Sequence, residues 1–315
     1  MQRLGLGLAA LGRPGYINLG HGHDLPEDKS PKAMQAHAFT VLDQAWSLGV
    51  RYFDMARSYG QAEAFFGQWL AQRGLARDAL LIASKWGYRY TANWQVDAEV
   101  HEVKSHQVDV LTQQWQQSQQ ALGWRPDLYQ IHSATLTSGA FQTGVLDRLA
   151  RIRDQGVAIV LTTSGPQQAE TLAKALTLKR GETPVFSAVQ ATYNLLEPSV
   201  AEALQQAHQQ GWRVVVKESL ANGRLTDRNL ALAQNNPLQE IAEHKGCSMA
   251  CLAMAAVLQQ PWVSHVLSGA TTIDQLKDNV QAVNVALTPQ DLDRLAQLQQ
   301  SPELYWKQRG ALAWN

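Results

Sequence analysis

The chain has 315 residues, of which 45% are hydrophobic and 17% are charged, a composition typical of a soluble globular protein with ample core material. Its formal net charge is zero, so no large electrostatic field is available to recruit nucleic acid or an anionic membrane. No apolar run reaches the roughly 18 residues of a membrane span, and two cysteines fit a reducing, cytoplasmic compartment.

Short apolar stretches alternate with amphipathic stretches along almost the entire sequence. The first apolar stretch, Leu4–Leu8, predicts a strand, and the spacing of apolar residues over 32–48 predicts the helix that follows it. Further strands are expected at residues 51–55, 80–86, 128–132, 158–164, 185–190, 212–218 and 263–269. Further helices are expected at residues 61–72, 110–122, 144–154, from Pro166 onward, 199–209, 238–259 and 272–283.

These eight pairs of a strand and a helix determine the expected fold class. Strands with nearly continuous apolar residues are typical of parallel sheets covered by helices. A closed (β/α)8 TIM barrel takes about 250 residues, so we expect one α/β barrel domain over residues 1–315, with long loops and a C-terminal tail. The alternative is an open doubly wound sheet, but the stretch "GLGLAA" lacks the third glycine of a dinucleotide-binding turn.

Polar residues stand at the carboxyl ends of successive expected strands, which meet at one mouth in an α/β barrel. Asp54, Lys85 and His132 end three strands, and Tyr59 follows closely after the first. A tyrosine with an ordinary pKa of about 10 becomes a better acid beside the ammonium of Lys85. Asp54 can hold that lysine in place, and His132 can orient and polarise a substrate carbonyl. The set predicts carbonyl reduction, with a hydride going to carbon and a proton to oxygen.

Four stretches of the sequence resemble the aldo-keto reductases, and the resemblance covers essentially the whole chain. They are "GVRYFDMARSYG", "LIASKWG", "DLYQIHS" and "SMACLAMAAVLQQPWVSHVLSGATTIDQLKDNV". The resemblance implies a (β/α)8 barrel that acts on a small carbonyl or alcohol substrate with NADP(H), with NAD(H) as the alternative. It implies that Tyr59 is the acid and base, supported by Asp54, Lys85 and His132. Trp86 and Ser133, at the ends of the same strands, are expected to face the substrate.

The same resemblance implies a cofactor site on the later strands. Ser164 and Gln190 should contact the nicotinamide amide, and the segment 269–279 should hold the adenosine end. Thr272 opens a helix whose N-terminal amides can receive a phosphate; the alternative, an ordinary capped helix, leaves the small residues before it unexplained. The residues expected to bind the cofactor are Ser164, Gln190, Lys217, Leu220, Gly269, Thr271, Gln275 and Asn279.

Three positions depart from the family pattern. Gly165 follows Ser164 where an asparagine is usual, and Lys217 stands where many members stack an aromatic ring on the nicotinamide. Lys217 could pair with Glu218, meet an anionic group of the cofactor or substrate, or point to solvent. Basic residues that grip the 2′-phosphate of NADP are replaced by Gly269 and Gln275, with Lys277 and Arg224 as candidate substitutes. We therefore expect weaker discrimination between NADPH and NADH than in a typical member.

Two alternatives to a reductase stay open at this point. A redox sensor or scaffold that binds the cofactor with little catalysis would explain Lys217. A metal-dependent hydrolase would need His21, His23 and Asp24 as ligands, but these residues lack a fourth, well-spaced ligand and fit a polar loop better, so no metal is predicted. This loop and the aromatic residues of the tail, Trp314 among them, are expected near the barrel mouth. No feature indicates an oligomeric state.

Overall fold

The computed structural model describes residues 3–229 and 236–315. Eight parallel strands form a closed barrel, with the order β1-β12-β11-β10-β7-β6-β3-β2 around it. The strands are β1 (Leu4–Gly7), β2 (Tyr52–Asp54), β3 (Leu81–Trp86), β6 (Leu128–Ala134), β7 (Ala158–Thr163), β10 (Ala188–Thr192), β11 (Arg213–Lys217) and β12 (His265–Ser268). The predicted (β/α)8 barrel is therefore confirmed.

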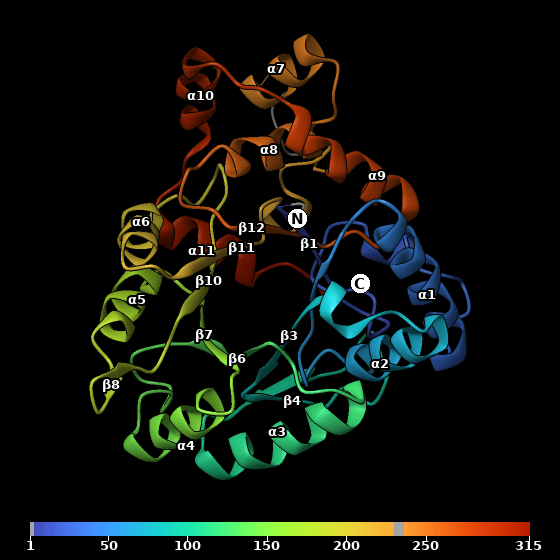
Figure 1. Ribbon diagram of the computed structural model, residues 1–315. Helices are drawn as coiled ribbons and strands as arrows, with labels where there is room; N and C mark the ends of the chain where they lie inside the picture. The colour runs from blue at the N-terminus through green and yellow to red at the C-terminus, as the bar shows by residue number, and fades with distance from the viewer. Residues whose placement is uncertain (1–2, 230–235) are drawn as a thin grey trace.

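Helices surround the barrel, as Figure 1 shows for α1 to α6. They are α1 (Pro31–Ser47), α2 (Ala62–Arg73), α3 (Val108–Leu122), α4 (Thr143–Arg153), α5 (Gln168–Leu176), α6 (Ala201–Gln209), α7 (Pro237–Lys245), α8 (Met249–Leu258), α9 (Ile273–Gln281), α10 (Pro289–Leu295) and α11 (Pro302–Gly310). Short 3-10 turns are η1 (His21–His23), η2 (Arg77–Ala79), η3 (Ala221–Gly223), η4 (Ala282–Asn284) and η5 (Ala296–Leu298). Two hairpins lie outside the barrel: β4 (Tyr88–Tyr90) with β5 (Glu102–Lys104), and β8 (Lys179–Arg180) with β9 (Thr183–Pro184).

The prediction of a single helix over residues 238–259 is wrong, because the chain forms two helices there, α7 and α8. Gly246 ends α7 with φ 67°, a left-handed conformation that glycine adopts without a Cβ penalty. The Ser248 hydroxyl then accepts a hydrogen bond from the Cys251 amide at 2.9 Å and starts α8. The apolar pattern continues across the break, so periodicity alone does not reveal it. Similarly, α5 begins at Gln168 rather than at Pro166.

No single helix in residues 3–229 and 236–315 has the length and apolar composition needed to cross a membrane. Helices α7 and α8 meet these two criteria only when they are taken together, and the pair is bent by 93°.

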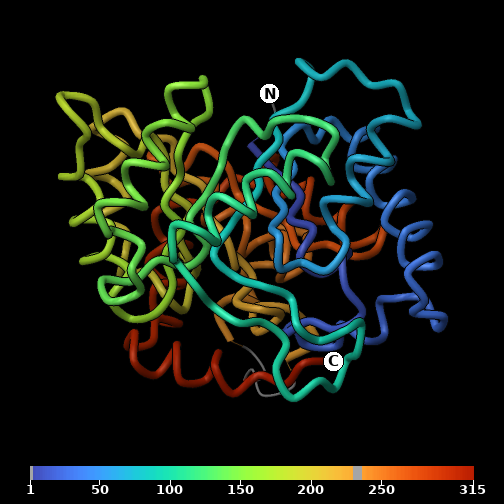
Figure 2. The backbone as a smooth tube through the Cα atoms, turned by 90° about the horizontal axis from the view of Figure 1, so that it is seen from below, coloured from blue at the N-terminus to red at the C-terminus, as the bar shows by residue number. Residues whose placement is uncertain are grey.

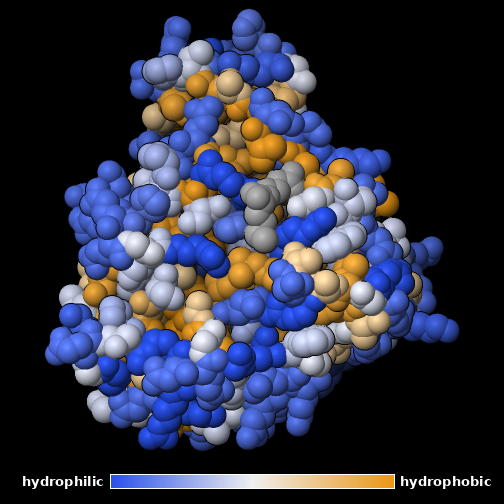
Figure 3. Space-filling view, in the orientation of Figure 1, coloured by the Kyte–Doolittle hydropathy of each residue, from blue (hydrophilic) through white to orange (hydrophobic). Residues whose placement is uncertain are grey.

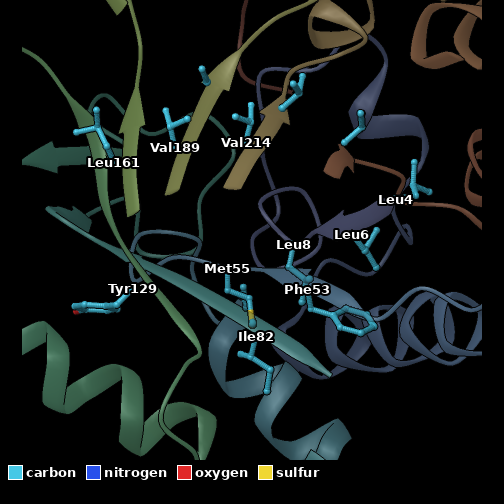
Figure 4. Packing of buried hydrophobic residues seen from close by; sticks show 14 of the residues in the cluster. Leu4, Leu6, Leu8, Phe53, Met55, Ile82, Tyr129, Leu161, Val189 and Val214 are labelled. Atoms are coloured by element: carbon cyan, nitrogen blue, oxygen red, sulfur yellow. The ribbon is translucent and has the colours of Figure 1, made fainter. Parts of the chain in front are cut away.

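Side chains alternate along the barrel strands between two apolar layers. Figure 4 shows Ile82 and Tyr129 pointing from their strands toward the helices, in the layer between sheet and helices. The second layer has one residue from each of seven strands: Tyr52, Ala83, Leu128, Val160, Ala188, Val215 and Leu267. The eighth strand contributes Gly5, where a Cβ would lie only 2.8 Å from the Tyr52 ring and 3.0 Å from Leu267. The small residue therefore leaves room for large neighbours inside the barrel.

Connecting segments gather over the carboxyl ends of the strands. Figure 2 shows the C-terminal segment running beside the segment that contains the β4–β5 hairpin. There the Trp314 ring stacks on His101, with 3.8 Å between ring centroids and 7° between planes. The main chain of Asn315 exchanges two hydrogen bonds of 3.1 Å with that of Tyr16 in the β1–α1 loop. Segments that are far apart in sequence thus meet at this face, where Figure 3 shows apolar residues in the middle and hydrophilic ones around them.

Candidate active site

A cavity of about 610 Å³ opens at the carboxyl ends of the barrel strands, within the volume range usual for small-molecule and cofactor sites. Its walls come from the strand ends, the β1–α1 loop, the segment after β11, the N-terminal part of α9 and the C-terminal segment. Asp54, Tyr59 and His132 line the cavity, and Lys85 lies against two of them. The structure therefore brings together the four residues that the sequence predicts as catalytic.

A buried ion pair joins the ends of β2 and β3. The Lys85 ammonium donates to the Asp54 carboxylate and to the Met55 carbonyl, the latter at 3.1 Å. The other carboxylate oxygen of Asp54 accepts hydrogen bonds from Gln130 Nε2 at 2.6 Å and from Gln190 Nε2 at 2.9 Å. Both charged side chains are almost fully buried, so these partners replace the water that each charge has lost. Gln130 was missed by the sequence analysis because it lies in the middle of an apparently apolar strand.

Tyr59 lies next to this pair, in the turn between β2 and α2. Its hydroxyl is 3.4 Å from Nε2 of His132, and the Lys85 nitrogen lies 4.9 Å from the centre of its ring. The β1–α1 loop approaches this turn so closely that a Cβ on Gly12 would lie 2.3 Å from the Tyr59 carbonyl oxygen. Gly60 adopts φ +57°, and a Cβ on this residue would lie 2.3 Å from the Gly12 carbonyl oxygen. The two glycines therefore allow the contact that fixes the position of the tyrosine.

The structure corrects the expected acidity of Tyr59. Burial raises its pKa well above 10, and the carboxylates of Asp54 and Glu102 raise it further. The ion pair with Asp54 offsets the charge of Lys85, whereas Arg13 lowers the tyrosine's pKa. The expectation that the Lys85 ammonium lowers the pKa of this phenol left out burial and the nearby carboxylates, which raise that pKa instead.

Arg13 is a further residue of this site that the sequence analysis missed. It is 2% exposed, pairs with the Glu102 carboxylate at 2.5 Å and lines the cavity. Its guanidinium carbon lies 4.8–5.1 Å from the ring centres of Tyr16, Tyr59 and Trp314. Such distances are typical of cation–π contacts. The sequence carries no spacing that links Arg13 to Tyr59, because the two belong to loops that meet only when the barrel closes.

His132 is held in its neutral form. Burial lowers its pKa well below 6.5, and the nearby ammonium of Lys85 lowers it further. The carbonyl of His132 lies 2.9 Å from Nε2 of His106, an interaction that fixes the end of β6. The next residue, Ser133, has φ 52° at an irregularity in the β6–β7 register, lines the cavity and lies with its hydroxyl 3.3 Å from that of Ser164. A neutral imidazole has one N–H, which can donate to an oxygen in the cavity.

All the residues predicted to bind the cofactor line the same cavity. They are Ser164, Gln190, Lys217, Leu220, Gly269, Thr271, Gln275 and Asn279. Trp86, which was expected to face the substrate, is fully buried with its ring 5.5 Å from that of His106, and it is not among the described residues of the cavity wall. The structure thus brings Ser133 to the cavity but not Trp86.

The far end of the cavity is built around Asp24, from the β1–α1 loop. Its carboxylate accepts hydrogen bonds from Gln275 Nε2 at 3.0 Å and from the Thr271 hydroxyl at 3.3 Å, and it forms a bidentate pair with Arg228 at 2.5 and 2.6 Å. Thr272 caps α9, as expected, in a reciprocal capping box with Gln275. An acidic group therefore lies where the resemblance implies the adenosine end of the cofactor.

The candidate substitutes for the missing basic residues are placed differently from the prediction. Arg224 lies over the Tyr305 ring at 4.2 Å and donates to the Ala221 carbonyl, and Lys277 is exposed on α9. Neither is among the described residues that line the cavity, whereas Arg228 is. Arg228 escaped the sequence analysis because it lies on an irregular segment after β11.

The cavity also offers groups that fit a dinucleotide. The side-chain oxygen of Asn222 is buried without a hydrogen-bond partner, and Asn222 lines the cavity, so an acceptor is free for a ligand donor. At Gly269 a Cβ would meet only Asn18, at 3.9 Å, so this part of the wall stays open. Both features are compatible with a bound dinucleotide.

The described residues contain no group of three or more His, Cys, Asp or Glu that could hold a metal ion. In the loop that contains His21, His23 and Asp24, the buried His21 ring has its Nε2 without a partner, and Asp24 pairs with Arg228.

The chain is similar to known proteins along most of its length. The model of the Aldo/keto reductase family matches residues 3–300. The chain is 25% identical to Protein tas of Escherichia coli, over 86% of this chain and 90% of that protein, and 27% identical to L-glyceraldehyde 3-phosphate reductase of Escherichia coli, over 89% and 85%. The solved holo form of an aldo-keto reductase from Bacillus halodurans superimposes with a TM-score of 0.71 at 21% identity, over 95% of this chain and 92% of that one.

Proposed function

The chain belongs to the aldo/keto reductase family, and on this premise we propose that it interconverts a small carbonyl compound and its alcohol, with Tyr59 as the general acid and base. The family consists of oxidoreductases that act on carbonyls with nicotinamide cofactors. The observation that carries the proposal is the Tyr59 hydroxyl, which lies 3.4 Å from Nε2 of His132 on the cavity wall. A carbonyl oxygen near both groups would meet a proton donor and a hydrogen-bond donor at once.

The chain's own residues supply the proton and the orientation. The nicotinamide ring, when bound, supplies or accepts the hydride. Tyr59 donates its proton to the substrate oxygen during reduction and takes it back during oxidation. Because burial keeps its pKa high, the phenolate that remains needs stabilisation, and Lys85 and Arg13 are the cations near its ring. His132 donates a hydrogen bond to the same oxygen and so fixes its position.

NADP(H) is the proposed cofactor, with NAD(H) as the alternative and little discrimination between them. Gly269 and Gln275 supply no cation for a 2′-phosphate, and Arg228 is already paired with Asp24. Fluorescence titration with both reduced nucleotides tests this point. An NADPH affinity more than about a hundredfold above that for NADH, equivalent to about 2.7 kcal/mol, would contradict it.

A panel of carbonyl substrates with both cofactors tests the proposed activity. The panel should include short aldehydes with and without a phosphate, since one relative is named as a reductase of an aldehyde phosphate. We expect Tyr59→Phe to keep its fold and nucleotide affinity while turnover falls by a factor on the order of 10²–10⁴, because only the acidic hydroxyl is removed.

Normal turnover by this variant would show that Tyr59 is not the acid. Tight nucleotide binding by the wild type, without turnover of any substrate in the panel, would favour the sensor alternative.

A further inference from the structure

Lys217 ends β11 with its ammonium on the cavity wall, among neutral hydroxyl groups. The nitrogen donates to the Thr192 hydroxyl at 2.7 Å and to the Ser164 hydroxyl at 3.3 Å. These two residues come from β10 and from the segment after β7, so three neighbouring barrel strands fix the position of the charge. The side chain is only 16% exposed, which excludes the option that it points to solvent.

The charge of Lys217 has no carboxylate of its own. Its nearest acid is Glu218, at 3.8 Å, but both oxygens of that carboxylate accept hydrogen bonds from Arg309, at 2.6–3.1 Å. Each other Arg or Lys side chain on the described cavity wall has a closer carboxylate partner: Arg13 with Glu102, Arg228 with Asp24, and Arg309 with Glu218. One positive charge therefore remains incompletely neutralised beside Ser164.

The consequence depends on the function proposed above, in which Ser164 and Gln190 hold the nicotinamide amide. A cation within hydrogen-bond distance of the Ser164 hydroxyl then lies against the nicotinamide subsite. The oxidised nicotinamide ring carries a formal positive charge and the reduced ring carries none. Lys217 repels the oxidised ring but not the reduced one, and because its side chain is only 16% exposed, water screens this repulsion weakly.

We propose that Lys217 makes this site select the reduced nucleotide over the oxidised one. An aromatic ring at this position would discriminate less, because a stacking partner brings no positive charge. Tighter binding of the reduced form also means that the bound oxidised ring accepts a hydride more readily than the free one. The substitution of an aromatic residue by lysine thus tunes the bound cofactor toward oxidation of the alcohol, without any contact to the substrate.

The test is a set of binding titrations with NADPH, NADP+, NADH and NAD+ at pH 7, in which binding is measured by calorimetry or by protein fluorescence. We expect wild-type protein to bind the reduced member of each pair at least about tenfold more tightly than the oxidised member. Lys217→Met should bring this ratio to within about threefold, chiefly by tightening the oxidised form. Lys217→Arg keeps the charge and should keep the ratio, which separates charge from packing.

A second experiment varies the pH, because burial lowers the pKa of Lys217 to about 8. The charges of Arg309 and Lys85 also lower this pKa, whereas those of Glu218 and Asp54 raise it. The ammonium is charged below that value and neutral above it. The reduced-to-oxidised preference should therefore shrink between pH 7 and pH 9 in wild type and stay flat in Lys217→Met. The charged or titratable groups that act on Lys217 or are acted on by it are Glu218 on its own segment, Arg309 from α11, Lys85 from β3, Asp54 from β2 and His132 from β6.

The outcomes separate the two proposals. Equal affinity of wild type for both redox forms, or an unchanged ratio in Lys217→Met, overturns the role of Lys217 and leaves the proposed function standing. Equal weakening of both forms in Lys217→Met also overturns it, because the lysine then binds a group that both forms share. If wild-type protein binds none of the four nucleotides, both proposals fail. Thr192→Val, which removes the 2.7 Å hydrogen bond but not the charge, should preserve the sign of the preference.

Discussion

The two ends of the cavity are built in different ways. At the Tyr59 end, strands β2, β3, β6 and β10 deliver Asp54, Lys85, His132 and Gln190, and a buried hydrogen-bond network joins three of these four side chains. At the α9 end, Asp24 comes from a long loop and meets Arg228 from another loop; the Arg228 side chain is 37% exposed and that of Asp24 is 10% exposed. One end is a rigid constellation on strands, and the other is an ion pair between loops.

This difference has consequences for energy and for chemistry. A buried pair with saturated hydrogen bonds cannot lose one partner without leaving a charge in a dry environment. A partly exposed pair can open and re-form at low cost, because water replaces either partner. We therefore expect the buried Asp54–Lys85 pair to be costly to disrupt, whereas the α9 end can be changed to set cofactor preference without disturbing catalysis.

The largest effect is expected for Asp54→Asn. Removing this carboxylate leaves the Lys85 ammonium buried without a counter-charge, which should cost about 3–5 kcal/mol in the free energy of unfolding and abolish most turnover. Urea denaturation and kcat on the same preparation measure both. Asp43→Asn is the matched control, because its pair with Arg73 is exposed, with side chains 44% and 40% accessible; unfolding and kcat should change little. Equal effects of the two substitutions would refute the contrast between buried and open pairs.

The same difference explains how far the sequence could be read. Strand ends recur at regular places in a barrel, so Asp54, Lys85 and His132 could be assigned to one mouth before any coordinates. The sequence did not reveal that Arg13 lies beside Tyr59, nor that Asp24 lies beside the segment expected to bind the cofactor. Loops that meet only in the folded state leave no periodic pattern. The high pKa of Tyr59 escaped prediction for a related reason, since burial and the carboxylate of Glu102 are features of tertiary structure.

Similarly, the break between α7 and α8 depends on one left-handed glycine within an apolar run, and periodicity averages over such a residue. The hairpin β4–β5, which brings Glu102 to Arg13, is too short and too polar to stand out as strands. What the sequence does not specify locally is thus concentrated in the segments that surround the cavity rather than in the barrel.

A smaller effect is expected at Arg13, which links the rigid end to the loops. Arg13 lowers the pKa of Tyr59 and Glu102 raises it, so Arg13→Met should raise that pKa further and Glu102→Gln should lower it. Alcohol oxidation requires the phenolate, whose fraction at a given pH below the pKa falls as the pKa rises. Oxidation at pH 8 should therefore fall about tenfold in Arg13→Met and rise in Glu102→Gln, with the pH–rate profiles displaced in opposite directions. Displacement in the same direction would indicate a purely structural role for the pair.

The smallest effect is expected at the α9 end, where Asp24→Asn removes a negative charge and releases Arg228 from its bidentate pair. A 2′-phosphate would then meet a free guanidinium instead of a carboxylate, so NADPH affinity should rise about five- to tenfold while NADH affinity changes little. Titration of both nucleotides measures the ratio, and kcat with a saturating cofactor should stay near the wild-type value. Asp274→Asn is the matched control, because it removes the same charge from the exposed first turn of α9, outside the described cavity wall. If both variants shifted the ratio alike, the effect would come from the overall field of the helix N-terminus, and Asp24 would not be a specificity determinant.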